Sequence, residues 1–193
     1  MKCFPLILSV ALLPLSAQNY KPLTAEERVK WFGVSTFGPR SLFISGPFTS
    51  AWRTYTNRPE EWGPHWGGFG KRYAARLLNN TVNNGVEASL GAVWNEDPRY
   101  FRLGEGSVGR RLGQAVKQTV MSRYGDGEYR FGFARAIGIT GGSFGQKLWM
   151  PDSVTSNRDC VVRIGGNYAG QFVGNLFREF SPELLKKLKL KKN

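Results

Sequence analysis

The stretch FGKRYAARLLNNTVNNGVEASLGAV, residues 69–93, decides the fold class of this chain. Apolar or small positions recur within it at steps of three and four residues: Phe69, Tyr73, Leu77, Thr81 or Val82, Gly85 or Val86, Leu90 and Val93. This spacing matches the turn of an α-helix that has one apolar face. The sequence therefore predicts a long amphipathic helix. Asp97 and Pro98 end it, because proline disfavours the helical conformation in the residue before it.

Two helical segments are predicted on the N-terminal side of this helix. Thr24 and Glu27 have the spacing of a capping box, in which a hydroxyl and a carboxylate satisfy backbone N–H groups at a helix start. Residues 41–55 are rich in aromatic side chains but contain Pro47, which removes a helical hydrogen bond. We therefore expect a capped first helix and a kinked or split second one.

Another helix is predicted to start at Ser107, which can cap it. Apolar side chains follow at every fourth position, at Val108, Leu112, Val116, Val120 and Tyr124. The turn residues Gly125, Asp126 and Gly127 then end the pattern. We expect the helix to extend as far as this turn.

Residues 131–149 and 161–180 share regularly spaced small residues. They lie four apart in each segment: Ala134, Gly138 and Gly142 in the first, and Gly166, Gly170 and Gly174 in the second. Each glycine costs a helix about 1 kcal/mol relative to alanine, so three on one face require compensation by packing. Such faces allow two helices to approach closely. The prediction is an all-α, single-domain helical bundle in which these two Gly-faced helices pack on each other.

The second of these segments also has a period that fits a β-strand. One face would carry Val162, Ile164, Tyr168, Phe172 and Leu176, and the other Arg163, Asn167, Gln171 and Asn175. An apolar face alternating with a polar one is typical of an outer-membrane strand. A small outer-membrane β-barrel is therefore the alternative fold.

The N-terminal residues have the pattern of a signal peptide. One lysine precedes an apolar run of about 12 residues, which is too short to span a bilayer. The small residues Ser16 and Ala17 then provide a cleavage site. We predict cleavage after residue 17 and a mature helical domain at 18–193. Loss of Lys2 would lower the net charge of +13 to +12. In an exported protein such an excess points to an anionic membrane surface or envelope polymer and not to nucleic acid.

A glycine pattern, Gly104, Gly106 and Gly109, resembles a phosphate-binding fingerprint. The fingerprint requires a buried strand before its first glycine, whereas the residues there include two arginines. We therefore expect a turn before a helix and no nucleotide cofactor. Arg110 and Arg111 lie in the first turn of this helix, where modest anion binding is expected.

No catalytic set or metal site is predicted. Ser143 lies in a Gly-x-Ser-x-Gly pattern, but the one histidine, His65, precedes it, whereas the base follows the nucleophile in that fold. One histidine and one mature cysteine do not provide zinc ligands at suitable spacing. A hydrolase of envelope polymers is a less favoured alternative, and we expect neither an enzyme nor a cofactor or metal.

Residues 181–193 are predicted to form a short basic amphipathic helix. Ser181 can cap it, Pro182 suits its first position, and leucines alternate with five lysines, Lys186, Lys187, Lys189, Lys191 and Lys192. Such a helix can lie on an anionic membrane surface. The alternative is a solvated tail.

Two blocks, GFGKRY at residues 68–73 and EDPRYFR at residues 96–102, carry a resemblance to a family. The chain resembles uncharacterised exported envelope proteins of Gram-negative bacteria such as Acidobacteria. The resemblance implies an envelope location and assigns no activity. The sequence therefore predicts a non-enzymatic envelope protein that associates with a membrane face or with an anionic or protein partner; its oligomeric state stays open.

Overall fold

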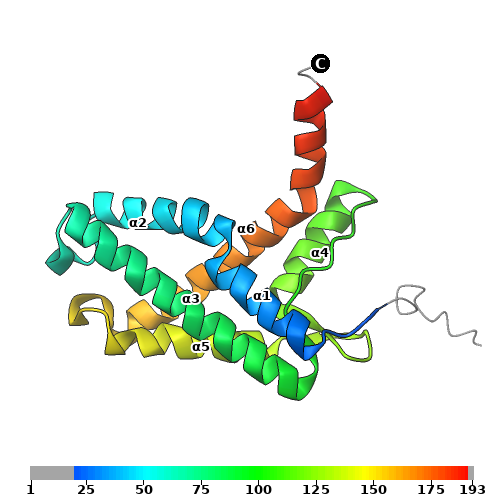
Figure 1. The fold of residues 1–193 in the computed structure, drawn as a ribbon, viewed down its shortest axis with the longest axis horizontal. Coiled ribbons are helices and arrows are strands. Elements are labelled where there is room, and N and C mark those ends of the chain that lie inside the picture. Colours follow the sequence, from blue (N-terminus) through cyan, green and yellow to red (C-terminus); the bar gives the residue numbers. More distant parts are fainter. Residues whose placement is uncertain (1–19, 191–193) are drawn as a thin grey trace, which may run out of the picture.

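The computed structural model describes residues 20–190, of which residues 184–190 are described by their backbone alone, and this part is predominantly helical (Figure 1). Its α-helices are α1 (Ala25–Phe37), α2 (Gly46–Tyr55), α3 (Trp66–Trp94), α4 (Val108–Val120), α5 (Phe133–Gly145) and α6 (Asn157–Leu190). Single turns of other helix types are η2 (Arg40–Ser45), η3 (Glu60–Trp62), η4 (Gln146–Leu148) and η5 (Asp152–Val154). The predicted all-α bundle is confirmed.

Helix α3 is the central element, and it packs against α5, α2 and α1 (Figure 1). Its 29 residues make it about 44 Å long. The predicted long helix is confirmed, although it begins at Trp66 and ends before Asp97. It ends at Trp94 because Asn95 adopts the left-handed conformation, with φ 54°.

The two N-terminal predictions are confirmed. The Thr24 hydroxyl accepts a hydrogen bond from the Glu27 amide at 3.2 Å, and the Glu27 carboxylate accepts one from the Thr24 amide at 2.9 Å. A π-helical turn, η2, leads into α2, and Pro47 lies in the first turn of α2, where its missing N–H does no harm. The second segment is therefore split at its proline.

The helix that starts at Ser107 is shorter than predicted. The Ser107 side chain caps α4 as expected, but α4 ends at Val120. Residues Met121–Tyr124 form strand β2, which pairs with β1 (Glu96–Asp97) on one side and β3 (Tyr129–Phe131) on the other, both antiparallel. At the C-terminal end of α4, the four-residue spacing of apolar side chains fits a helix and one face of a strand equally well. The Gly125–Gly127 turn favours a hairpin between β2 and β3.

The mutual packing predicted for the two glycine faces is wrong. A Cβ placed on Gly138 would lie 2.7 Å from the Asn83 carbonyl oxygen, so the face of Ala134, Gly138 and Gly142 packs against α3. Around Gly166, Gly170 and Gly174 no described atom comes within 4 Å of such a Cβ. Helix α6 contacts α5 through other side chains, and its glycine face stays open.

Helix α6 corrects two further predictions. Residues 161–177 are helical, so the strand interpretation of their alternation is wrong. No separate helix begins at Ser181, because α6 continues through Pro182, and its last turns extend away from the other helices (Figure 1). Near this proline the Glu179 carbonyl accepts hydrogen bonds from Arg102 at 2.8 Å and Arg111 at 2.7 Å, so these two side chains hold this turn of α6 in place.

The interior between these helices is mostly polar. Apart from prolines, only five apolar side chains are buried within residues 20–183: Ala115, Ala134, Ile139, Met150 and Cys160. Arginine, carboxylate, amide and hydroxyl groups fill the rest. Between α3 and α5, for example, the Arg135 Nε donates to the Glu87 Oε1 at 2.9 Å. Directional hydrogen bonds therefore fix much of the packing.

Candidate functional site

The glycine-rich segment around Gly104 binds a carboxylate that belongs to the protein itself. Glu179 of α6 is fully buried and accepts hydrogen bonds from the backbone N–H groups of Leu103 and Gly104, at 3.1 and 3.0 Å. The Tyr100 hydroxyl donates to the same carboxylate at 2.7 Å. The segment therefore fastens the EDPRYFR block to α6, and its N–H groups are occupied.

Arg111, one of the two predicted anion-binding arginines, is buried and paired. Its guanidinium donates to Glu179 at 3.0 Å and forms an ion pair with Glu183 at 2.7 Å. Two carboxylates thus neutralise it, and it is not available to an external anion in this structure. Arg110, by contrast, is exposed.

The Glu179 and Glu183 carboxylates make stability depend on pH. Burial opposes ionisation of Glu179, but hydrogen bonds from Tyr100, the Gly104 amide and Arg111 outweigh it and lower its pKa below 4.5. A hydrogen bond from Arg111 is the largest cause of the lowered pKa of Glu183. A lowered folded-state pKa contributes stability above the unfolded value, and this contribution is lost as the pH falls through the folded value.

We therefore expect the melting temperature to fall when the pH is lowered from about 6 to about 3, and to fall less in Glu183→Gln, which lacks one of the two groups. Circular dichroism melts measure this. Glu105→Gln is the control, because Glu105 is exposed and lies outside the cluster. An identical pH dependence of Glu183→Gln and the wild type would contradict this assignment.

The predicted lysine site lies mostly beyond the described side chains. Lys186, Lys187 and Lys189 belong to the last turns of α6, of which only the backbone is described. Lys191 and Lys192 lie outside the described residues. Membrane binding by these lysines stays a prediction.

Ser143 does not have the surroundings of a nucleophile. It is fully buried on α5, and the amide of Asn167 donates to its Oγ at 3.2 Å. His65 is an exposed residue at the start of α3. Among the described residues, no three His, Cys, Asp or Glu side chains gather in a way that could hold a metal ion.

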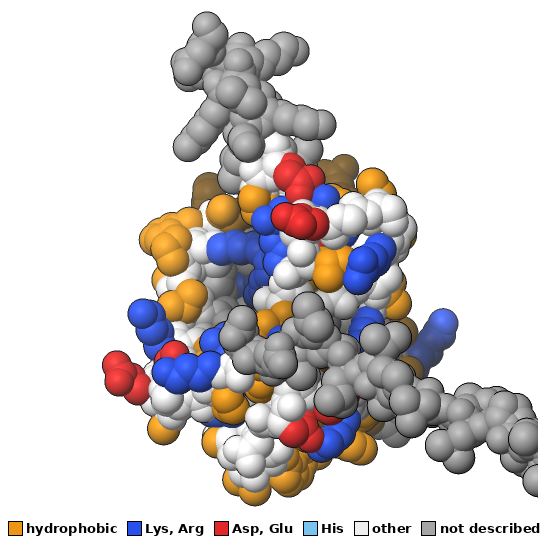
Figure 2. Space-filling view, turned by 90° about the vertical axis from the view of Figure 1, so that its right-hand side faces the viewer, with side chains coloured by type: hydrophobic (Ala, Val, Ile, Leu, Met, Phe, Trp, Pro, Cys, Tyr) orange, Lys and Arg blue, Asp and Glu red, His pale blue; other side chains and the backbone are white. Residues whose placement is uncertain are grey.

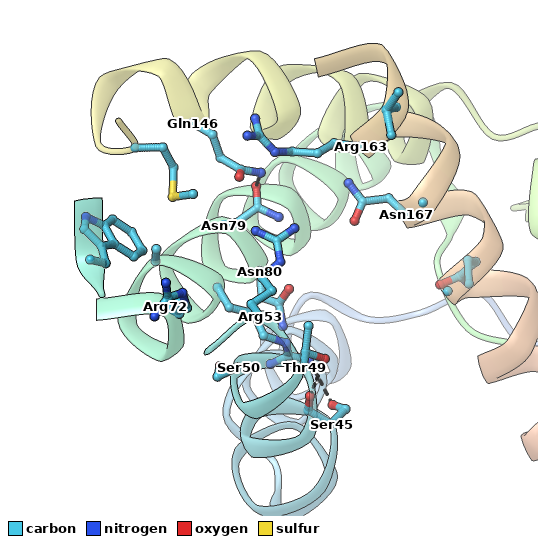
Figure 3. A pocket seen from close by; sticks show the side chains of 18 of the residues that line it. Ser45, Thr49, Ser50, Arg53, Arg72, Asn79, Asn80, Gln146, Arg163 and Asn167 are labelled. Atoms are coloured by element: carbon cyan, nitrogen blue, oxygen red, sulfur yellow. Dashed lines mark hydrogen bonds between the residues drawn. The ribbon is translucent and has the colours of Figure 1, made fainter. Parts of the chain in front are cut away.

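A polar cavity of about 650 Å³ lies between α2, α3 and α6, with residues near η4 closing one end (Figure 3). Five arginines line it, and no aspartate or glutamate does: Arg40, Arg53, Arg72, Arg76 and Arg163. Hydroxyl and amide side chains such as Thr49 and Asn80 fill the space between them. The open glycine face of α6 contributes Gly166 and Gly170 to the wall. The cavity is therefore strongly electropositive.

Two of these arginines have structural partners. Arg72, from the GFGKRY block, donates to the carbonyl oxygens of Arg58, Gly63 and Pro59 at 2.9, 2.7 and 2.7 Å, and so holds the loop before α3. The Nη2 of Arg76 donates to the Ser45 hydroxyl at 2.9 Å. Both arginines add charge to the cavity, and Arg72 has most of its donors engaged.

Arg53 and Arg163 enter the cavity from opposite walls, α2 and α6 (Figure 3). Within the described part of the chain the Arg53 guanidinium has neither a hydrogen bond nor an ion pair. Arg163 donates through Nη2 to the Val154 carbonyl, while its buried Nη1 has no partner. The Oγ of Ser50, a residue only 1% exposed, also lacks one. Polar groups without a partner therefore occur in both of these walls.

The surroundings of Arg53 disfavour the charged form of its guanidinium. Burial lowers the pKa of its guanidinium, and the nearby positive charges of Arg163 and Arg72 lower it further. Sequence reasoning missed this cluster, because its walls come from segments more than 100 residues apart. The one local signal is the pair Arg72 and Arg76, four residues apart and hence on one face of α3.

The outer surface carries the large apolar side chains that the interior lacks. We call Phe48, Trp52, Tyr55 and Trp66 the aromatic face; these side chains of α2 and the start of α3 are 75%, 61%, 84% and 85% exposed. Figure 2 shows, on one side of the molecule, hydrophobic side chains scattered among arginines and lysines, and a hollow whose wall carries basic side chains. Exposed aromatic side chains in such number are typical of a surface that binds a membrane or another protein.

No protein-family model, curated protein or solved structure matches this chain at a significant level. The resemblance carried by the GFGKRY and EDPRYFR blocks therefore stays a prediction. In this structure the two blocks have a packing role, since Arg72 organises a loop and Tyr100 anchors α6.

Proposed function

We propose that this protein is a non-enzymatic, exported envelope protein that associates with an anionic membrane face through its aromatic face. The observation that carries the proposal is that polar side chains fill the interior while large aromatic side chains lie on the surface, the opposite of the usual arrangement. Phe48 and Trp52 lie four residues apart on α2, so they point the same way. Aromatic rings of this kind partition well into the headgroup region of a bilayer.

The surface charge favours an anionic membrane over a neutral one. The chain carries a net charge of +13, and Arg58 and Lys71, which are close in sequence to Tyr55 and Trp66, are exposed. Each basic residue close to an anionic surface contributes about 1 kcal/mol of binding free energy. Within residues 20–190, no helix combines the length and the apolar character that a membrane span requires. The proposal is therefore attachment at the membrane face.

We expect the protein to sediment with vesicles that contain phosphatidylglycerol, and to bind them less tightly when Phe48→Ser and Trp52→Ser are combined. If each ring buries about 80 Å² in the interface, the pair contributes about 4 kcal/mol, so a loss of affinity of at least about tenfold is expected. The matched control is Val108→Ser with Val116→Ser on α4, whose side chains are 69% and 52% exposed. Equal binding by both double variants would contradict a role for the aromatic face.

The envelope location and the role of the C-terminal lysines need separate tests. Cell fractionation is expected to recover the protein outside the cytoplasm, and recovery in the cytoplasm alone would reject export. Deletion of residues 182–193 is expected to weaken vesicle binding mainly at low salt, since interactions between exposed charges are screened as the ionic strength rises. Unchanged binding at low salt would remove the tail from the proposal.

A further inference from the structure

We infer that the arginine-lined cavity between α2, α3 and α6 is a binding site for a phosphate group. Five arginines and no carboxylate line it, and among its lining residues the Arg163 Nη1 and the Ser50 Oγ lack a hydrogen-bond partner within the described part of the chain. Several positive charges gathered in a partly buried cavity without carboxylates are unfavourable in a folded protein, and functional sites are where such arrangements are retained. An anion that enters the cavity removes this cost.

The donor types select phosphate over other anions. Guanidinium groups match the oxygens of a phosphate in pairs, and several of them can surround its charge. The hydroxyl of Ser50 and the amide of Asn80 supply neutral donors on the walls from α2 and α3 (Figure 3). These groups can satisfy the oxygens that the arginines do not reach.

The size of the cavity indicates that the phosphate is attached to an organic group. Its volume of about 650 Å³ falls within the range of sites that hold small organic molecules. Trp62, Met150 and Val162 add apolar surface to the wall. Both a phospholipid headgroup and a soluble phosphate monoester have this combination of charged and less polar parts.

The open glycine face of α6 fits this use. Gly166 and Gly170 line the cavity, and a Cβ on either would meet no described atom within 4 Å, so helix packing does not require them. Side chains there would fill part of the cavity. These two glycines weaken the helix and do not improve its packing. The space that they leave in the cavity accounts for their presence.

Isothermal titration calorimetry on the full chain tests the inference with pyrophosphate, glycerol 3-phosphate and a short-chain phosphatidate below its micelle concentration. We expect at least one probe to bind with a Kd below about 1 mM, and the Arg53→Gln and Arg163→Gln double variant to bind it at least about tenfold more weakly. Arg110→Gln, an exposed arginine outside the cavity, is the control and is expected to stay within about twofold of the wild type. Tighter binding of phosphatidate than of glycerol 3-phosphate would identify lipid as the source of the phosphate, and the reverse order a soluble monoester.

Thermal unfolding provides a second measurement that separates a binding defect from a folding defect. Arg53→Gln removes an unpartnered charge, so its melting temperature without phosphate is expected to equal or exceed that of the wild type. The best-binding probe is expected to raise the melting temperature of the wild type and not of the double variant. Absence of binding by all three probes, or equal binding by the double variant and the wild type, would overturn the inference. These outcomes do not depend on vesicle binding, so the membrane proposal succeeds or fails separately.

Discussion

Replacing Arg135 by methionine is expected to lower the free energy of unfolding by about 3–5 kcal/mol, because it leaves a buried carboxylate without its counter-ion. The Arg135 Nε lies 2.9 Å from the Glu87 Oε1, and the two side chains are only 4% and 12% exposed. The same guanidinium also donates to the Gln118 carbonyl at 2.8 Å. One substitution therefore breaks an ion pair and removes the donor to a buried carbonyl group.

The matched test adds Glu87→Leu to Arg135→Met and measures both variants by urea unfolding. Removal of both charges is expected to restore more than half of the lost stability, since an apolar pair of similar volume replaces a buried ion pair at little cost. The remaining loss reflects the Gln118 carbonyl. A loss below about 1 kcal/mol in the single variant would show that water or another cation compensates Glu87.

Substituting Gly138 by alanine is expected to cost about 1–3 kcal/mol, the usual cost of overpacking a tight interior contact. The added Cβ would lie 2.7 Å from the Asn83 carbonyl oxygen of α3, and backbone cannot move aside as a flexible side chain can. Helices α3 and α5 would have to separate. The same substitution at Gly170 meets no described atom within 4 Å and is expected to add up to about 1 kcal/mol through helix propensity.

Urea unfolding of the two alanine variants checks the opposite signs. Both replace a helical glycine by the same residue, so the propensity gain cancels in the comparison, and the difference isolates the contact with α3. Equal changes in stability would mean that α5 does not approach α3 as closely as described. A loss at Gly170 would mean that a further group covers the open face of α6.

The distribution of polarity connects these stability effects with the proposed function. Interior ion pairs such as Arg135 with Glu87 make the fold depend on electrostatics, whereas the aromatic face, Phe48, Trp52, Tyr55 and Trp66, stays outside. Exposed aromatic rings contribute little to the stability of an isolated monomer and much to binding at an apolar interface. Variants of this face are thus expected to change binding and leave the melting temperature nearly unchanged.

Local signals in the sequence predicted local structure well. The capping box of Thr24 and Glu27, the Ser107 cap and the split at Pro47 are each set by residues three or four positions apart. The end of α4 was harder, because valines at steps of four fit a helix and also one face of a strand. Pairing with β1 and β3, which comes from distant residues, resolved that ambiguity.

The candidate sites were less accessible to sequence reasoning. Arg111 looked like a surface anion site, but Glu179, 68 residues away, occupies it. The two glycine faces looked complementary, yet small residues show only that close approach is possible and do not specify the partner. Arg53 and Arg163 carry no motif, since the property that unites them is a shared cavity between α2 and α6.

The sequence by itself determined the helical periodicity of α3, the caps of α1 and α4, and the excess of basic residues, because each depends on composition or on contacts within one turn. Only the tertiary structure decided that Gly138 faces Asn83, that Glu179 fills the glycine-rich segment, and that five arginines share one cavity. The physical reason is that these features are contacts between distant segments. Side-chain chemistry specifies what a residue can contact, and the path of the backbone selects which of the possible partners it meets.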